Sequence, residues 1–342
     1  MGDILHALPA VTALRQAHPG WAIDWVVEPR WSALLSADVA MESKIGVGRS
    51  TARPIVNELH LAPTRDWRKS PVNAKTLHEI NGLRRTLRAG HYDAVIDLQG
   101  AVRSAVIGRM AGCPRLIGED EPRERAARWL FSDRVKTHGA HVIEQDLELA
   151  SAVAGDDLQP TAPWLPVDVA AERWVDEVMG DDPQPAVLIN PGAGWGAKRW
   201  PAERYATVAQ GLIDRGMRVL VNAGPGEEPL AEAIVHSADA AVPLACTLKQ
   251  LIALTRRVAL AIAGDTGPLH LACALGRPVV GIYGPTDPRR NGPFGTRFRV
   301  LRSPESRRDH TRHAAPEAGL MTIMPEDVLR AADELLAEET GL

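Results

Sequence analysis

The chain has 342 residues, enough for two domains, and its formal net charge of −4 excludes a protein that is basic throughout and coats nucleic acid. Apolar residues make up 45% and charged residues 24%, an ordinary globular composition with no run of the roughly 18–20 apolar residues that a membrane span needs and no pattern of a secretory signal. The cysteines are too few and too scattered for a disulfide framework or a zinc site and favour a reducing compartment; they are Cys113, Cys246 and Cys273.

The first predicted element is a helix, because apolar residues from Ile4 to Leu14 recur at helical spacing before Pro19-Gly20 ends it. Gly2-Asp3 is its predicted N-cap. A doubly wound domain normally begins with a strand that leads into such a helix, and only Met1 precedes this one. We therefore expect the first strand to be missing from the chain as written or to lie upstream. Two strands are predicted after the helix, at residues 21–27 and 93–98.

The second half of the chain alternates short apolar runs with amphipathic stretches. Strands are predicted at residues 186–190, 217–222, 258–263 and 279–283. Helices are predicted at residues 170–179, 204–215, from about 227, and at 268–275. Strands that alternate with helices at this spacing indicate βαβ units and a parallel sheet, and their continuous apolar character is typical of a sheet covered on both faces.

Residues 155–169 interrupt this alternation with three prolines and paired aspartates, which is the composition of a linker. We therefore expect an N-terminal domain of residues 1–160 and a C-terminal domain of residues 161–324. A final segment, residues 325–342, is predicted to be a helix with one buried stripe: Val328, Leu329, Ala332, Leu335 and Leu336.

The most specific motif lies between residues 258 and 287, where an apolar strand ends in the sequence GDTG and a helix opens with Pro268. Thr266 or Asp265 can cap this helix, and a glycine-containing turn at a helix start presents N–H groups to an anion. His270 follows one turn later on the same face. The pattern indicates a diphosphate or sugar pocket at the carboxyl end of a parallel strand; the alternative is a well-capped helix with a buried histidine.

Two further turns could contribute to such a pocket. Residues 189–205 form a Gly-rich loop that carries Lys198, but its spacing matches neither a P-loop nor the dinucleotide fingerprint, so it indicates a cation near a phosphate or a plain turn. Residues 222–228 place Glu227 and Glu228 where a carboxylate could bind a ribose. The alternative is that both acids are favoured there only by the helix dipole.

Basic residues are concentrated in one part of the N-terminal half. The segment from Lys44 to Lys136 holds 18 basic and 10 acidic side chains. Within it Arg65, Arg68 and Lys69 surround a tryptophan, and Arg123 and Arg125 flank Glu124. The segment forms either a solvated surface or a face that meets an anionic partner.

Four stretches together resemble the ADP-heptose:lipopolysaccharide heptosyltransferases: residues 2–11 (GDILHALPAV), 93–100 (DAVIDLQG), 191–201 (PGAGWGAKRWP) and 264–286 (GDTGPLHLACALGRPVVGIYGPT). The resemblance spans nearly the whole chain, and the last stretch is its most specific part. The sequences RDWRK at residues 65–69 and PRE at residues 122–124 resemble the heptosyltransferase I type, which adds the first heptose to the inner-core Kdo.

The resemblance implies an α/β protein of the GT-B fold, in which two Rossmann-like doubly wound domains face a central cleft and the C-terminal helix packs back toward the N-terminal domain. It implies that Asp3 is the catalytic base. The implied donor-binding residues are Lys198 at the diphosphate, Glu227 at the ribose, Asp265 at the sugar, Thr266 and Gly267 at the phosphate-binding helix start, and His270. The implied acceptor-binding residues are Arg65, Arg68, Lys69 and Arg123.

The implied reaction is an inverting transfer of heptose from ADP-heptose to the Kdo inner core of lipid A. We expect no cofactor besides the donor and no metal, because neither proposed site holds an Asp-x-Asp pair. The expected partners are the Kdo–lipid A acceptor and the anionic surface of the inner membrane, with peripheral attachment to its cytoplasmic face and no nucleic acid. The alternatives are a transferase for the second heptose or another nucleotide sugar, and a non-catalytic nucleotide-sugar-binding protein.

Overall fold

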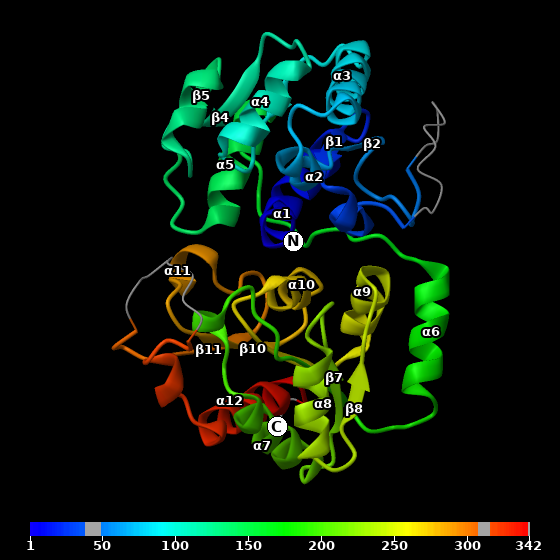
Figure 1. Cartoon of the computed structure of the whole chain (residues 1–342), viewed down its shortest axis with the longest axis vertical. Coiled ribbons are helices and arrows are strands. Elements are labelled where there is room, and N and C mark those ends of the chain that lie inside the picture. The colour runs from blue at the N-terminus through cyan, green and yellow to red at the C-terminus, as the bar shows by residue number, and fades with distance from the viewer. Residues whose placement is uncertain (38–48, 307–314, 341–342) are drawn as a thin grey trace. The chain divides into compact units, whose positions relative to one another are not determined.

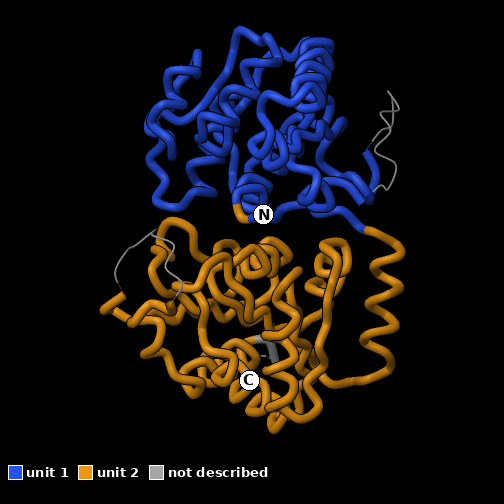
Figure 2. Tube along the Cα trace, viewed as in Figure 1, with its two compact units in different colours: residues 1, 3–167 blue, residues 2, 168–342 orange. Residues whose placement is uncertain are grey.

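The computed structural model of the chain describes residues 1–37, 49–306 and 315–340. It divides into two compact units: unit 1 holds residues 1 and 3–167, and unit 2 holds residues 2 and 168–342 (Figure 2). The division after Val167 falls inside the proline-containing segment 155–169.

Unit 1 alternates helices with short parallel strands (Figure 1). Its described strands pair as two sheets, one of two strands in the order β1-β2 and one of three in the order β3-β4-β5. The register places Asp24 opposite Glu58 and Ile117 opposite Asp133. The elements are α1 (Gly2–Ala17), β1 (Asp24–Val27), η1 (Pro29–Leu34), β2 (Glu58–Leu61), α2 (Thr64–Lys69), α3 (Ala74–Ala89), β3 (Val95–Ile96), α4 (Val102–Met110), β4 (Leu116–Glu119), η2 (Arg125–Leu130), β5 (Asp133–Val135) and α5 (Val142–Ala154).

Helix α1 is buried on nearly all sides, which is expected of a helix that is apolar all round. Its residues Ala10, Ala13 and Leu14 pack against α5 and against Ile23 and Ile96, which lie at β1 and within β3. The predicted N-cap is wrong: Met1 is the cap residue, and Asp3 lies in the first turn. A carboxylate is favoured there because the first turn carries the positive end of the helix dipole.

Unit 2 is built on one six-stranded parallel sheet in the order β11-β10-β9-β6-β7-β8. Helices α7, α8 and α12 cover one face of this sheet, and α10 covers the other (Figure 1). The elements are α6 (Val169–Met179), β6 (Ala186–Asn190), η3 (Gly196–Lys198), α7 (Ala202–Ile213), β7 (Arg218–Asn222), α8 (Glu228–His236), β8 (Val242–Leu244), α9 (Leu248–Arg257), β9 (Leu260–Gly264), α10 (Gly267–Ala274), β10 (Val279–Tyr283), α11 (Pro288–Asn291), β11 (Phe298–Arg302), η4 (Leu320–Thr322) and α12 (Pro325–Thr340).

The strand order of unit 2 is that of a classic Rossmann sheet, which runs outward from its first strand in both directions. The first strand in the chain, β6, lies between β7 and β9, so the direction of winding changes between β6 and β9. Open α/β sheets bind ligands outside the carboxyl ends of the strands at this switch point. The topology therefore predicts a ligand site where the loops after β6 and β9 meet.

The described part of the C-terminal helix, α12, packs within unit 2, and its expected packing toward the N-terminal domain stays a prediction. Its residues Val328, Ala332 and Leu335 are fully buried in the core of unit 2. The helix packs against α7, β10 and β11. The predicted apolar stripe exists, and the sheet of unit 2 is the apolar surface that buries it.

Candidate active site

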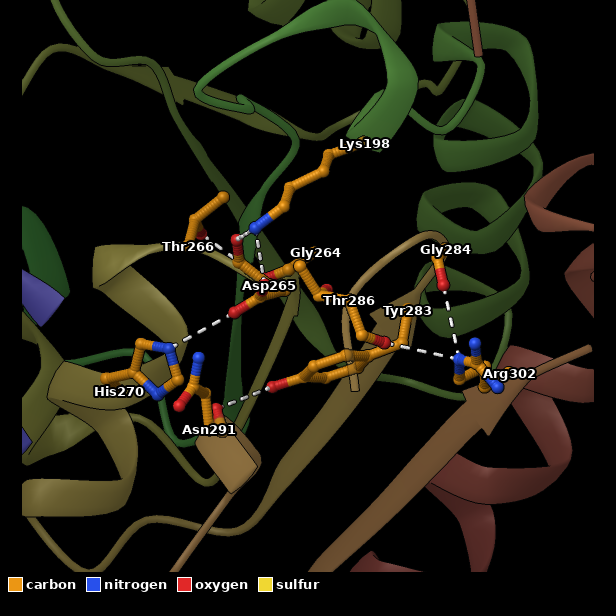
Figure 3. A network of polar contacts seen from close by, with 10 residues as sticks. All are labelled: Lys198, Gly264, Asp265, Thr266, His270, Tyr283, Gly284, Thr286, Asn291 and Arg302. Atoms are coloured by element: carbon orange, nitrogen blue, oxygen red, sulfur yellow. Dashed lines mark hydrogen bonds and ion pairs between the residues drawn. The ribbon is translucent and has the colours of Figure 1, made fainter. Parts of the chain in front are cut away.

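The loops at the switch point of unit 2 place Lys198 against Asp265 (Figure 3). Lys198 ends η3 in the loop after β6, and Asp265 directly follows β9. The Lys198 Nζ atom lies 2.5 Å from Asp265 Oδ2, and the two side chains are only 10% and 8% exposed. The Trp195 ring lies 4.3 Å from the same nitrogen, so an aromatic face covers the ammonium group. The structure thus brings two predicted donor-binding residues into one buried ion pair.

His270 completes this network from the first turns of α10. Its Nε2 atom lies 3.3 Å from Asp265 Oδ1, so Lys198 and His270 contact different oxygens of one carboxylate. Burial raises the pKa of Asp265, but the hydrogen bond with His270 and the charge of Lys198 outweigh it and hold the pKa well below its ordinary value. Asp265 is therefore a carboxylate at every physiological pH. His270 is buried, and its ring contacts this carboxylate.

The start of α10 is open to an anion. Thr266 is the cap residue, yet its hydroxyl donates to the Gly264 carbonyl at 3.2 Å. Thr266 is thus the N-cap residue, as predicted, but among the described residues no side-chain hydrogen bond caps this helix. The Asp265 carboxylate instead contacts Lys198 and His270, one at each oxygen. The N–H groups of Gly267 and Leu269 and the helix dipole can therefore bind a phosphate; Pro268 has no N–H, and the His270 N–H donates to the Thr266 carbonyl at 3.4 Å.

Glu227 precedes α8 and faces the glycine-rich loop after β6. Its Oε2 atom accepts a hydrogen bond from the Gly224 N–H at 3.2 Å, and a methyl group placed on Gly192 would overlap its carboxylate. Glu228 instead accepts from the Gly226 N–H at 3.1 Å, within its own turn. Of the two acids, Glu227 is therefore the one next to the switch-point loops.

Buried asparagines, which the sequence analysis did not select, hold the ends of two of these strands. Asn222 Nδ2, at the end of β7, donates to Asn190 Oδ1, at the end of β6, over 2.9 Å. Asn222 Oδ1 in turn accepts from the Cys246 N–H at 3.1 Å. The sequence did contain a signal for these residues, because each of two successive apolar strands ends in an asparagine.

Asp3 lies in unit 1 with its carboxylate exposed. Gln99 Nε2 donates to its Oδ2 atom at 3.0 Å, and an Arg123 guanidinium nitrogen lies 3.6 Å from the same oxygen. Gln99 is positioned by Asp97, whose Oδ1 atom accepts from the backbone N–H groups of Gln99 and Gly100. The structure thus joins the predicted base to one predicted acceptor-binding residue, and Gln99 and Asp97 are two contributors that the sequence analysis missed. The signal for them was the sequence DLQG after a strand.

A second buried carboxyl group lies near Asp3. Burial raises the pKa of Asp146, in α5, well above its ordinary value, and the charges of Glu119 and Asp3 add to this rise. Burial likewise raises the pKa of Asp97, against the hydrogen bonds from Gln99 and Ser104. Of these three carboxyl groups, Asp146 and Asp97 are buried and Asp3 is exposed.

The remaining predicted acceptor-binding residues are gathered on α2. Arg65, Arg68 and Lys69 are all exposed, whereas Trp67 between them is buried and donates to Glu79 at 2.9 Å. Lys69 is paired with Asp66 at 2.8 Å. Lys44, at which the basic segment begins, lies outside the described residues.

Within the described residues, one group of side chains has metal-ligating atoms close together: Asp24, Glu58 and His60, on β1 and β2. Tyr92 already occupies the centre of this group, since its hydroxyl donates to Asp24 at 2.8 Å and contacts His60 Nε2 at 2.9 Å. The group contains none of the predicted site residues.

A family model for glycosyltransferase family 9 (heptosyltransferase) matches residues 80–320. This chain belongs to glycosyltransferase family 9. Lipopolysaccharide heptosyltransferase 1 of Escherichia coli (strain K12) is 33% identical over 312 residues, covering 89% of this chain and 91% of that protein. The chain is thus a glycosyltransferase. The network of Lys198, Asp265 and His270 at the switch point therefore belongs to a protein of a sugar-transferring family.

Two solved structures support the family 9 assignment. E. coli heptosyltransferase WaaC with ADP matches with a TM-score of 0.79 at 27% identity, over 98% of this chain and 97% of that one. E. coli heptosyltransferase WaaC with ADP-2-deoxy-2-fluoro heptose matches with a TM-score of 0.77 at 26% identity, over 98% and 96%. The expected GT-B class with Rossmann-like units is confirmed. In the described part of this family 9 chain, no helix is both long and apolar enough to span a membrane.

Proposed function

We propose that this chain transfers heptose from ADP-heptose to the Kdo inner core of lipid A, as a heptosyltransferase of type I. The observation that carries the proposal is the buried network of Lys198, Asp265 and His270 beside an uncapped helix start at the switch point of a Rossmann sheet. Two pieces of evidence support the donor: the complexes of the WaaC relative with ADP and with an ADP-heptose analogue. The 33% identity to a type 1 enzyme supports the type of acceptor.

The donor half of the reaction uses positive charge to stabilise the leaving diphosphate. As the bond between the anomeric carbon and the diphosphate oxygen breaks, its electron pair stays with ADP. We expect the Lys198 ammonium and the N–H groups at the start of α10 to take up this charge, and removing one such donor typically costs about 10²–10³ in rate. The proposal needs no cofactor besides the donor, since these groups supply the positive charge.

The acceptor half requires a base. We assign this role to Asp3, which takes the proton from the acceptor hydroxyl while the hydroxyl oxygen bonds to the anomeric carbon from the face opposite ADP. General-base catalysis of this kind contributes about 10²–10⁴ in rate. Gln99 and Arg123 hold the carboxylate in place, and an Asp3 oxygen remains to accept the proton.

The acceptor and the membrane explain the concentration of basic residues in unit 1. Kdo carboxylates and lipid A phosphates are anionic, and Arg65, Arg68, Lys69 and Arg123 are exposed cations that can bind them. We infer peripheral attachment to the cytoplasmic face of the inner membrane, with the anionic surface as partner. Such attachment weakens at high salt, since exposed charges are screened.

Asp3→Ala tests the assignment of the base. We expect transfer to fall by at least about 10², the lower range for a lost base, with the dissociation constant for ADP unchanged by calorimetry. Asp93→Ala is the matched control, because Asp93 is another exposed carboxylate of unit 1. An equal loss of ADP affinity in Asp3→Ala would contradict the assignment.

Transfer assays of the wild-type chain with different donors and acceptors separate the alternatives. Preference for a UDP- or GDP-sugar over ADP-heptose would indicate another nucleotide-sugar transferase, and transfer only to an acceptor that already carries one heptose would indicate the type II reaction. Tight binding of ADP without turnover on any acceptor would indicate a non-catalytic binding protein.

A further inference from the structure

Two neighbouring elements of unit 1 form an exposed face that the proposed reaction does not use. Helix α4 and η2 pack together, and their contact includes the buried residues Ala105 and Ala127. Arg109 Nε also donates to the Leu130 carbonyl at 2.6 Å and so links the ends of the two elements. Six exposed residues form the outer side, which we call the Trp129 face: Arg103, Val106, Arg109, Arg125, Ala126 and Trp129.

The centre of the Trp129 face is apolar. The Trp129 residue is 79% exposed and Val106 is 46% exposed, whereas Trp21 and Trp164 of the same unit are only 39% and 38% exposed. An indole ring with this much solvent exposure lacks most of the stabilising free energy that its burial would supply. Its apolar body and polar N–H suit a membrane–water interface, where tryptophan is enriched.

Exposed arginines lie on the same two elements as this apolar centre. Within residues 1–37, 49–306 and 315–340, no ion-pair partner contacts Arg103, Arg109 or Arg125. The acidic residues near the face are engaged: Glu124 accepts the Val102 N–H at 2.9 Å, and Asp120 pairs with Arg128, whose guanidinium lies 5.7 Å from the centre of the Trp129 ring. The face therefore offers three exposed cations on the two elements that carry Val106 and Trp129.

We propose that the Trp129 face docks the enzyme on an anionic lipid bilayer, with the arginines at the lipid phosphates and Trp129 and Val106 in the headgroup region. The proposal rests on the peripheral attachment proposed above and identifies the surface of the protein that contacts the membrane. Charge complementarity favours a bilayer over an apolar protein partner, because a bilayer of anionic lipids offers many phosphates around an apolar interior. The face also adjoins the reacting group: Arg123, which pairs with Asp3, lies two residues before η2.

The two kinds of residue contribute differently to the affinity. A cation near an anionic membrane surface raises binding about fivefold, and salt screens this gain. Insertion of an indole ring raises binding by roughly tenfold or more, and salt does not weaken this gain. Raising the salt concentration should therefore reduce binding without removing the contribution of Trp129.

Sedimentation of the full chain with vesicles of phosphatidylethanolamine and phosphatidylglycerol tests the proposal, with vesicles of phosphatidylcholine as the neutral comparison. We expect Trp129→Ser to lower binding about tenfold at both low and high salt, and the pair Arg103→Gln and Arg125→Gln to lower it at low salt only. The matched controls are Trp164→Ser and Arg173→Gln, which change a tryptophan and an exposed arginine elsewhere. Transfer to a water-soluble Kdo acceptor without acyl chains should be unchanged in Trp129→Ser, which shows that the variant folds.

Three other outcomes would each contradict the proposal, in a way that shows which step of it is wrong. If the wild type fails to bind either vesicle, the proposed peripheral attachment is wrong, and this proposal falls with it. If the wild type binds anionic vesicles and Trp129→Ser binds equally well, attachment stands and the Trp129 face is not its surface. If Trp129→Ser abolishes a concentration-dependent dimer and leaves vesicle binding unchanged, the face belongs to a second copy of the chain.

Discussion

Breaking the buried ion pair of Lys198 and Asp265 should strongly destabilise unit 2. Asp265→Asn keeps the shape of the side chain and removes its charge, which leaves the Lys198 ammonium 10% exposed with no carboxylate against it. Removing one partner of a buried pair costs about 3–5 kcal/mol, because the remaining charge stays desolvated. At roughly 2–4 °C per kcal/mol for a unit of this size, the midpoint of thermal unfolding should fall by about 6–20 °C.

Calorimetry or circular dichroism at pH 7 measures this loss, and a double-mutant cycle assigns it to the pair. Lys198→Met combined with Asp265→Asn should cost less than the two single changes together, by about 0.5–3 kcal/mol. Asp239→Asn is the control, because it changes an exposed aspartate of the same unit and should lie within about 0.5 kcal/mol of the wild type. The reasoning fails if Asp265→Asn matches this control or if the two changes are additive.

Two further predictions concern the same edge of the sheet. The folded-state pKa of Asp265 lies below its ordinary value of 3.8, so its stabilising contribution is complete above about pH 4 and is lost as the pH falls through the lower folded value. The stability difference between the wild type and Asp265→Asn, measured by urea unfolding, should therefore narrow below pH 4, and a constant difference down to pH 2 would contradict the low pKa. Gly192→Ala should displace Glu227 and weaken ADP binding about tenfold by calorimetry, since a lost hydrogen bond to a charged group costs about 1.5–3 kcal/mol, whereas Gly194→Ala meets no atom within 4 Å and should bind ADP normally. Equal affinities in these two variants would remove Glu227 from the nucleotide site.

Local patterns were sufficient to predict most elements of unit 2. The strand predicted at residues 186–190 is β6, and the helix predicted at residues 268–275 is α10 with a shift of one residue. These elements are readable because the strands are continuously apolar and the turn before α10 carries glycine, threonine and proline in the order that a helix start requires. Unit 1 was harder, since its described strands have two to four residues, too few to show a period.

The sequence indicated candidate residues of the site but not the contacts between them. Lys198, Asp265 and His270 could be selected as candidates by their places in turns, but the side chains of Lys198 and Asp265 come from positions 67 residues apart. The cap position of α10 was predicted, but its side-chain hydrogen bond is not formed: the Thr266 hydroxyl donates to the Gly264 carbonyl, and the Asp265 carboxylate contacts Lys198 from another loop.

Residue types and their order along the chain thus determined the alternation of strands and helices and the turns that can bind an anion, because these depend on neighbours within a few positions. The order of the strands, the pairing of Lys198 with Asp265 and the placing of Gln99 and Arg123 around Asp3 were decided by the tertiary structure. The physical reason is that each of these contacts joins segments far apart in the chain, and for Lys198 and Asp265 burial also removes the water that would otherwise compensate each charge.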